Sequence, residues 1–153
     1  DLTVNILTNY AINKGMIKIF GGNQLRPNLH INDYCDVVDV LINSETVKIK
    51  NQIFNVGYQN LSIIQIGELV KKVVEKIFPN KNEINIMIEP SDDNRSYHIN
   101  SDKIKNLLSY SPKRSIENAV EDLCVAFKNG LLKNSFNNDI YFNIERMKNI
   151  QAK

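Results

Sequence analysis

The sequence predicts an α/β fold in which short strands are packed by helices. Apolar runs with helical spacing alternate along the chain with short runs that are apolar at every second position. Glycine, asparagine and proline residues separate these runs and mark the turns. Of the 153 residues, 42% are hydrophobic and 24% are charged, which is typical of a globular domain with a buried core. We expect one domain over residues 1–130 and a polar tail over residues 131–153 that is partly disordered or lightly docked.

Five helices are predicted from apolar spacing together with start and stop signals. The first runs from Leu2 to about Lys14, because its apolar residues share one face and Gly15 can end it in the left-handed conformation. Four more begin at residues that cap helix N-termini well. They are expected from Asp33 to about Ser44, from Ser62 to about Pro79, from Ser101 to Leu108 and from Ser115 to about Lys128.

Five short strands are expected between these helices, because the intervening runs are rich in β-branched and aromatic residues. They are Met16–Phe20, Leu29–Ile31, Gln52–Val56, Ile84–Ile88 and Ser96–Ile99. In the fourth strand, Ile84, Ile86 and Ile88 share one face, which should be buried. A polar loop is expected over residues 91–94.

The most informative stretch of the chain runs from Ile19 to Tyr34. Gly21 and Gly22 followed by Asn23 mark a turn, since glycine and asparagine tolerate a positive φ. Arg26 lies just beyond that turn. The stretch resembles the nucleotide-sugar-binding segment of the NAD-dependent epimerase/dehydratase family, the extended short-chain dehydrogenase/reductases. In that family an arginine after a glycine-containing turn contacts the diphosphate of the sugar nucleotide.

Later segments extend the resemblance over about residues 1–130. Residues 52–57, followed by the helix from Ser62, resemble the last parallel strand of the family's cofactor domain and the helix after it. Residues 93–108 resemble a strand-to-helix segment of the family, and residues 111–123 resemble the helix that follows it.

The resemblance implies the C-terminal, substrate-binding portion of an extended short-chain dehydrogenase/reductase fold, with the Rossmann cofactor half missing. In the intact enzyme, NAD would oxidise a carbon of a nucleoside diphosphate-sugar before epimerisation, loss of water or reduction. The implied partners are that nucleotide-sugar and the missing N-terminal Rossmann domain. The isolated chain is expected to bind no NAD and to be inactive.

Five residues are candidate ligands of the nucleotide-sugar under this resemblance. Arg26 and Arg95 each follow a loop, and a guanidinium can grip phosphates bidentately. Leu2 and Asn5 match the start of a helix that meets the nucleotide in the family, where free N–H groups can face a phosphate. Asn28 matches a position near the sugar or nucleotide. Each candidate also has a competing role without a ligand. For an arginine this is a surface ion pair, for Leu2 and Asn5 it is helix packing and capping, and for Asn28 it is an exposed loop amide.

The chemistry of the family's catalytic half is missing from the sequence. No glycine fingerprint for a dinucleotide is present. Tyr10 and Lys14 have the Y-x-x-x-K spacing of the family's acid/base pair, but they lie in the segment that matches a substrate-side helix, which favours an ordinary helix pair. His30 and His98 are interpreted as hydrogen-bonded structural histidines, and Asp33 as a helix cap rather than a ligand.

Charge, hydropathy and cysteine content exclude several classes of function. A formal charge of +2 argues against a nucleic-acid surface. The apolar runs are far shorter than the roughly 20 residues that span a bilayer, and a signal peptide's basic start is absent, so we expect no membrane partner and a cytoplasmic location. Cys35 and Cys124 lack the pattern of a disulfide framework or zinc site and are expected to be reduced and structural.

Two alternatives to a nucleotide-sugar enzyme remain open at this stage. The chain could be a non-catalytic binding or interaction module that retains the fold after loss of the catalytic half. It could also be a scaffold without a ligand, in which case neither arginine would line a pocket. A missing Rossmann half should leave an apolar face uncovered, on the strand around Ile53 and the helix from Ser62, and that face predicts a homodimer.

Overall fold

The computed structural model describes residues 2–93 and 95–151, so Asn94 of the predicted polar loop and the last two residues of the tail lie outside the described residues. The helices in these ranges are α1 (Thr3–Lys14), α2 (Ile31–Ile42), α3 (Thr46–Ile49), α4 (Ile63–Ile77), α5 (Asp102–Leu108), α6 (Ile116–Lys128), α7 (Asn143–Asn149) and the 3-10 helix η1 (Asp139–Tyr141). The strands are β1 (Met16–Phe20), β2 (Leu25–Asn28), β3 (Gln59–Ser62) and β4 (Asn85–Glu89). The α/β class is therefore confirmed, with short strands and helices in alternation.

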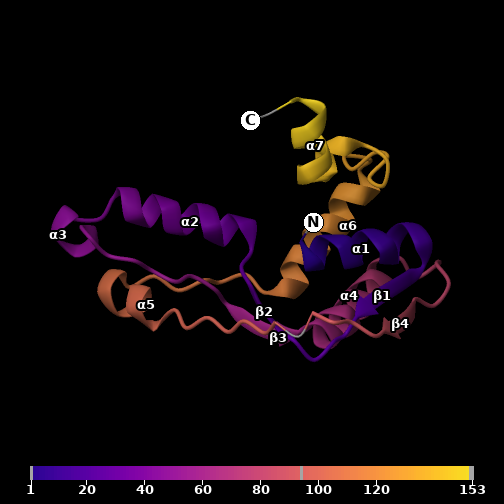
Figure 1. Cartoon of the computed structure of the whole chain (residues 1–153), viewed down its shortest axis with the longest axis horizontal. Coiled ribbons are helices and arrows are strands. Elements are labelled where there is room, and N and C mark those ends of the chain that lie inside the picture. Colours follow the sequence, from indigo (N-terminus) through magenta and orange to yellow (C-terminus); the bar gives the residue numbers. More distant parts are fainter. Residues whose placement is uncertain (1, 94, 152–153) are drawn as a thin grey trace.

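The body of the molecule is a parallel pair of strands, β1 and β4, covered by α1, α4 and α6 (Figure 1). The two strands pair in register from Met16 opposite Asn85 to Phe20 opposite Glu89. Apolar faces of the three helices meet over this pair and form the main core, because burying them removes their apolar surface from water. Its fully buried members include Ala11, Ile17, Ile66, Val70, Val74, Val120 and Cys124.

The position of β4 is as predicted, but the face that carries its isoleucines is only partly buried. Ile84 is buried and Ile86 is half-buried, as the alternation predicts. Ile88, by contrast, is exposed, although it lies on the same face of the strand. Ile19, opposite Ile88 on β1, is buried, so the burial of the strand pair is greater on β1 than on β4 at this end.

The double-glycine turn directs the chain from the body into a second, antiparallel pair, β2 with β3. Gly21 and Gly22 have φ of 75° and 134°, as the turn requires. A Cβ at Gly22 would lie 2.5 Å from Cγ1 of Ile64, so the side chain at the start of α4 fills the space beside the turn. The turn therefore fixes where β2, and with it Arg26, leaves the body.

The predicted strand at Leu29–Ile31 is wrong, and so is the assignment of Asp33 as the N-cap of the next helix. The strand lies three to four residues earlier, at β2, and Ile31 is already helical. His30 is the N-cap: its Nδ1 accepts a hydrogen bond from the backbone N–H of Asn32 at 3.2 Å. A histidine nitrogen can take the role of the usual cap oxygen, and this displaces the start of α2 towards the N-terminus.

The arm consists of α2, α3, the extended residues 51–57 and α5, and it projects from the body beyond β2 and β3 (Figure 1). It has its own small core of Val37, Ile104 and Tyr110, with Phe54 and Val56 packed against it. The predicted strand Gln52–Val56 is wrong as an assignment, since no strand of the described residues pairs with it. The predicted strand Ser96–Ile99 is also unassigned, although the Tyr97 N–H donates to the Leu25 carbonyl at 3.1 Å.

Two of the helix caps predicted from serine residues are confirmed and a third is wrong. Ser62 and Ser115 each form a capping box with the residue three positions on, Gln65 and Asn118. Ser101 makes no side-chain cap on α5. Its hydroxyl instead donates to the Gly57 carbonyl and accepts from the Gly57 N–H, both at 2.9 Å, and so fastens α5 to the extended segment.

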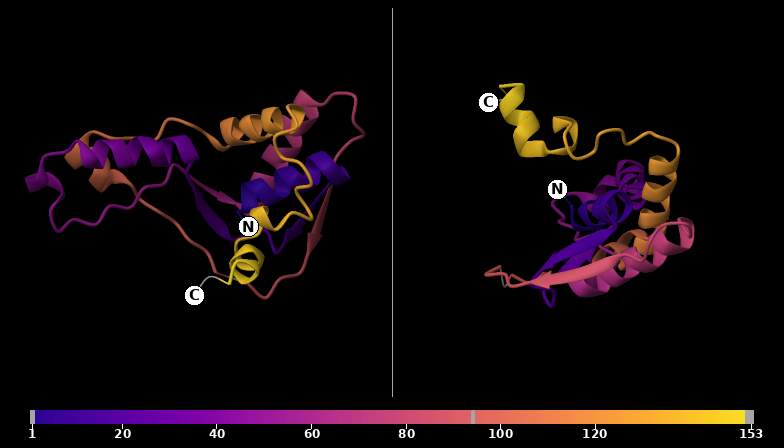
Figure 2. Two further views of the ribbon diagram at one scale, coloured as in Figure 1. Left: turned by 90° about the horizontal axis from the view of Figure 1, so that it is seen from above. Right: turned by 90° about the vertical axis from the view of Figure 1, so that its right-hand side faces the viewer.

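The tail docks on α1 and then turns away to α7 (Figure 2). Ser135 is buried, and its hydroxyl donates to Oδ1 of Asn9 at 2.7 Å. The ring of Phe136 meets Tyr10 edge-on with centroids 4.9 Å apart. No helix in the described ranges is long and apolar enough to cross a membrane.

Candidate functional site

A cleft of about 730 Å³ lies where β2, the start of α2 and the N-terminal ends of α1 and α6 converge. Its lining is mainly apolar, with a few polar groups among leucine, isoleucine, alanine and tyrosine side chains. The lining includes Leu2, Asn5, Arg26, Asn28, His30, Tyr34, Tyr58, Gln59, Arg114 and Asp122. Four of the five predicted ligand residues, all except Arg95, therefore line one cleft.

Arg26 lies on β2, with its side chain only 20% exposed. Its Nη1 donates to the carbonyls of Leu25 at 2.9 Å and Arg95 at 2.6 Å. Its Nη2 lies 3.6 Å from Oδ2 of Asp93, and its guanidinium carbon lies 5.4 Å from the centroid of the Tyr97 ring. One end of the guanidinium is thus held by two carbonyls, while the other end makes only a loose ion pair.

Arg95 does not line the cleft, and its side chain is 72% exposed. Its Nε and Nη2 donate to the two carboxylate oxygens of Asp93 at 2.7 and 2.9 Å. The paired Arg95 side chain lowers the pKa of Asp93 from 3.8 to about 2, with smaller contributions from the Arg95 backbone N–H and from Arg26. Asp93 therefore lies between the two arginines that the sequence predicts to clamp a diphosphate.

The first turn of α1 supplies Leu2 and Asn5 to the cleft. Leu2 is the N-cap residue of α1 and makes no side-chain cap hydrogen bond. A helix N-terminus carries a partial positive charge and free N–H donors. This wall of the cleft is thus suited to an anion.

Asn28 and His30 line the cleft where β2 passes into α2. The Asn28 amide donates to the carbonyls of Arg26 at 2.7 Å and Gln59 at 3.2 Å, so it stiffens the β2–β3 pair. His30 is buried, and its Nε2 lies 3.3 Å from Oδ2 of Asp122. His30 is hydrogen-bonded and structural as predicted, whereas His98, predicted to be similar, is exposed.

Asp33 and Arg114 form a buried junction beside the cleft that sequence reasoning missed. Asp33 is fully buried, and its Oδ1 lies 2.7 Å from Nη1 of Arg114. Its Oδ2 accepts the backbone N–H groups of Lys113 and Arg114 at 3.2 and 2.9 Å, and its carbonyl accepts the hydroxyl of Tyr110 at 2.6 Å. Burial raises the pKa of Tyr110, with Asp33 contributing in the same direction.

Signals for the missed cleft residues exist but are weak. Arg114 directly precedes the cap of α6, where a positive charge opposes the helix dipole, which indicates a partner elsewhere in the fold. Tyr34 shares its helical face with Ile31 and Val38, so the spacing already marks an apolar stripe. Tyr58 follows Gly57 in a run without periodicity, and the sequence contains no signal for it.

Tyr10 and Lys14 do not line the cleft. Both contact the ring of Phe136 in the tail, Tyr10 by its edge and Lys14 with its Nζ 5.1 Å from the centroid. Cys35 is exposed on α2, whereas Cys124 is buried, and burial raises the pKa of its thiol to about 11. Both cysteines are free, as expected.

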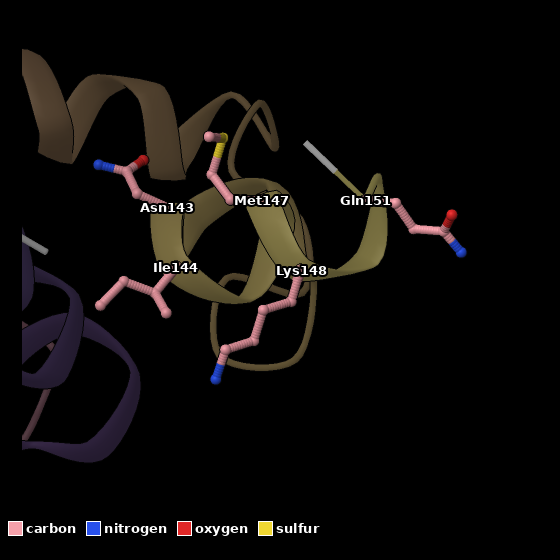
Figure 3. Close-up of a pocket in the computed structure, with 5 residues that line it drawn as sticks. All are labelled: Asn143, Ile144, Met147, Lys148 and Gln151. Carbon is pink, nitrogen blue, oxygen red and sulfur yellow. The ribbon is translucent and has the colours of Figure 1, made fainter. Parts of the chain in front are cut away.

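A second cavity, of about 500 Å³, lies on α7 in the tail (Figure 3). Its five lining residues come from α7 and from the turn that follows it: Asn143, Ile144, Met147, Lys148 and Gln151. Figure 3 shows their side chains spread in different directions rather than converging on one point. The arrangement offers no set of groups that could hold one ligand.

The glycine turn does not fit a dinucleotide. The Gly22 N–H already donates to Oε1 of Gln24, and a Cβ on Gly21 would meet the same Gln24 side chain. Ile64 fills the space beside Gly22. A dinucleotide cradle requires free N–H groups and open space beside the glycines, and this turn has neither at Gly22. The described residues also contain no group of three or more metal-ligating side chains.

A comparison with protein-family models finds no match, and a comparison with curated proteins finds no significant match. Solved structures do match. Pal from Bacillus thuringiensis aligns at 25% identity with a TM-score of 0.68, over 84% of this chain and 39% of that one.

Two of the solved structures contain nucleotide-sugars. The UDP-glucuronic acid 4-epimerase from Bacillus cereus, in complex with UDP-glucuronic acid and NAD, aligns at 20% identity with a TM-score of 0.69, over 84% of this chain and 40% of that one. The UDP-glucose 4-epimerase from Thermotoga maritima, with UDP-glucose, aligns at 22% identity with a TM-score of 0.66, over 85% of this chain and 40% of that one. This chain thus spans about 40% of the length of the proteins it matches.

Proposed function

Because this chain has the fold of the C-terminal part of the NAD-dependent epimerase/dehydratase family, we propose that its cleft binds the nucleoside diphosphate portion of a nucleotide-sugar. The observation that carries the proposal is the convergence of Leu2, Asn5, Arg26 and Asn28 on one cleft. These residues come from β2 and from the N-terminal end of α1, and the family resemblance implies each of them from the sequence.

The cleft offers complementary chemistry for each portion of such a ligand. The uncapped first turn of α1 and the Nη2 end of Arg26 provide donors and positive charge for two phosphates. Tyr34 and Tyr58 provide aromatic surface for the base or the sugar ring. Asn28 can offer its amide oxygen, because its amide nitrogen is the group already used on β2 and β3.

The anion would compete with Asp93 for Arg26. The Arg26–Asp93 pair is 3.6 Å long and partly exposed, so exchanging that carboxylate for a phosphate loses little. The Nη1 bonds to the carbonyls of Leu25 and Arg95 can persist, and they hold the guanidinium in place while Nη2 turns to the ligand. We retain Arg95 as a weaker candidate, since reaching the cleft would require it to leave Asp93.

We infer that any NAD site belongs to a portion of the protein outside these 153 residues, because the glycine turn is filled by Gln24 and Ile64. NAD would supply reversible removal of hydride from a sugar carbon. The contribution of this chain is to bind and orient the nucleotide-sugar so that this carbon faces the cofactor. Oxidation followed by epimerisation, dehydration or reduction is the activity that we propose for the intact protein, and the isolated chain should show no turnover.

Isothermal titration calorimetry of the chain with UDP, dTDP, ADP, GDP and CDP, and then with the matching sugar conjugates, tests the proposal. We expect one nucleotide class to bind and the Arg26→Ala variant to bind it about tenfold more weakly, as for loss of one charge-assisted contact. Arg146→Ala is the matched control: Arg146 lies on α7, is paired with Asp139 and does not line the cleft.

Equal binding by wild type and Arg26→Ala would refute the role of Arg26. Absence of heat with every nucleotide would favour the alternative of a non-catalytic interaction module. Where binding is seen, wild-type affinity in the Arg146→Ala variant is required, because it shows that removal of an arginine outside the cleft does not weaken binding.

A further inference from the structure

The side-chain amide of Gln24 joins the end of β1, the double-glycine turn and the loop that carries Asp93. Its Oε1 accepts the backbone N–H of Gly22 at 2.5 Å, and its Nε2 donates to the carbonyl of Phe20 at 3.0 Å. The same Nε2 makes a longer hydrogen bond, of 3.5 Å, to the carbonyl of Asp93, which lies 69 residues further along the chain. Gln24 is buried. A buried amide that uses both its donor and its acceptor holds the backbone groups around it in place.

The packing around this amide is as close as its hydrogen bonds. A Cβ at Gly21 would lie 2.6 Å from Nε2 of Gln24, so the amide lies directly against this glycine. The backbone carbonyl of Gln24 accepts the N–H of Ile63, the first residue of α4, at 3.3 Å. Gln24 therefore closes the turn with its side chain and fastens the turn to the body with its backbone.

Gln24 lies at the joint between the two walls of the cleft that offer positive charge. One wall is the N-terminal end of α1, and α1 leads directly into β1 in the body. The other wall includes Arg26 on β2, which begins immediately after Gln24. The chain between β1 and β2 consists of residues 21–24 alone. The direction of this short turn therefore sets where Arg26 lies relative to the first turn of α1.

The guanidinium of Arg26 is held by two stretches of backbone that Gln24 also supports. Its Nη1 donates to the carbonyl of Leu25, next to Gln24, and to the carbonyl of Arg95, two residues after Asp93. Both acceptors are backbone atoms, so their positions depend on the path of the chain. Gln24 fixes the first path through the turn and supports the second through the Asp93 carbonyl. A planar guanidinium held at Nη1 presents Nη2 in a defined direction.

We propose that Gln24 is a positioning residue for Arg26. Gln24 does not line the cleft, so it acts through the turn and through the Asp93 carbonyl rather than by contact with a ligand. A donor that is already in place binds an anion more tightly than a mobile one, because less conformational entropy is lost on binding. The predicted effect on ligand affinity rests on the proposed function, whereas the order of the Arg26 guanidinium can be measured without a ligand.

Gln24→Met tests this role, because methionine can fill the space against Gly21 without forming the amide hydrogen bonds. Asn60→Leu is the matched control. The Asn60 amide also makes two hydrogen bonds to the backbone of a distant residue, donating to the Ile99 carbonyl at 3.0 Å and accepting the Ile99 N–H at 2.9 Å. Asn60 lies on β3 and does not line the cleft. The control thus removes a similar amide contact away from the glycine turn.

The first measurement is NMR of the Arg26 guanidinium without a ligand. In the wild type, the hydrogen bonds of Nη1 should slow rotation of the guanidinium and give separate signals for its two Nη nitrogens. Loss of these signals in Arg26→Ala assigns them. We expect the signals to merge in Gln24→Met and to stay separate in Asn60→Leu. Separate signals in Gln24→Met would overturn the proposal, as would merged signals in the wild type or in both variants.

The second measurement is a calorimetric titration with inorganic pyrophosphate, which carries two linked phosphates without a base or a sugar. We expect Gln24→Met to bind it about fivefold more weakly and Asn60→Leu to bind it as the wild type does. In the Arg26→Ala background, Gln24→Met should have no further effect, because a positioning residue acts through the group that it positions. Losses that add in the double variant would overturn the proposal.

The two measurements separate the positioning role from the proposed function. If the wild type binds neither pyrophosphate nor any nucleotide, the proposed function fails, whereas Arg26 signals that merge only in Gln24→Met would still support the positioning role. If pyrophosphate binds equally to the wild type and to Gln24→Met, the anion site stands and the positioning role of Gln24 is refuted.

Discussion

Arg114 reaches from the loop before α6 to Asp33 in the first turn of α2, with Nη1 2.7 Å from Oδ1 of the buried carboxylate. The same nitrogen lies 2.7 Å from Oδ2 of Asp36, which is largely exposed. Since α2 belongs to the arm and α6 to the body, this contact fixes the angle at which the two meet. The cleft lies at that meeting point and Arg114 lines it, so the shape of the cleft depends on this ion pair.

Arg114→Ala should lower the free energy of unfolding clearly, because it leaves the buried Asp33 carboxylate with backbone donors alone. Asp36→Asn removes only the exposed partner and should change it by about 0.5 kcal/mol or less. Urea denaturation followed by circular dichroism measures both. A similar loss in the two variants would show that Asp33 does not depend on Arg114 for its charge.

Asp93 should remain ionised far into acid. The hydrogen bonds from the Arg95 side chain lower its pKa from 3.8 to about 2 in the folded chain. Because the folded pKa lies below the unfolded one, the stabilisation is present above about pH 4 and is lost as the pH falls towards 2. A carboxyl-carbon NMR titration should give a midpoint near 2, and Arg95→Gln should return it towards 3.8. A midpoint near 3.8 in the wild type would contradict the ion pair between Arg95 and Asp93.

Gly22 of the double-glycine turn should tolerate substitution less well than Gly15, the left-handed glycine that ends α1. Gly22→Ala combines a φ of 134° with a Cβ 2.5 Å from Ile64, and should lower stability by about 2 kcal/mol or more. Gly15→Ala, with a φ of 64° and no atom within 4 Å, should cost about 1 kcal/mol. Thermal and urea unfolding compare the two variants. Equal losses would mean that Ile64 moves aside without cost.

Local signals in the sequence were sufficient to predict the helix caps and turns that depend only on residues close together in the chain. The Ser62 and Ser115 capping boxes close within three residues, and the φ values of Gly21 and Gly22 are set by the turn itself. The four cleft residues Leu2, Asn5, Arg26 and Asn28 came from the family resemblance rather than from any local rule. Their convergence depends on how α1 and β2 pack, which no local pattern specifies.

The predictions that failed depend on the presence or absence of partners far along the chain. Asp33 satisfies the local rule for an N-cap, but its partner Arg114 lies 81 residues later, and the buried pair prevails. The residues from Gln52 to Val56 have the alternation of a strand, yet no strand among the described residues pairs with them. The assignment therefore fails for lack of a neighbouring strand among the described residues rather than for lack of β propensity.

Four exposed apolar residues of α2, Ile31, Tyr34, Val38 and Ile42, predict that the isolated chain associates with itself when it is concentrated. The sequence placed this apolar face on the Ile53 strand and the helix from Ser62; the structure keeps Ile53 exposed but buries Ile66 and Val70 of α4 in the body, so α2 takes that role. Sedimentation velocity should show a monomer at low micromolar concentration and a growing dimer fraction above it.

Ile42→Lys should weaken the dimer, because a lysine at this position places a charge in the apolar contact. Ile144→Lys is the matched control: Ile144 is similarly exposed but lies on α7. A dimer that survives Ile42→Lys and is lost with Ile144→Lys would move the contact to the tail. A monomer at every concentration would mean that these apolar residues of α2 are too few to hold two chains together, and would refute the prediction.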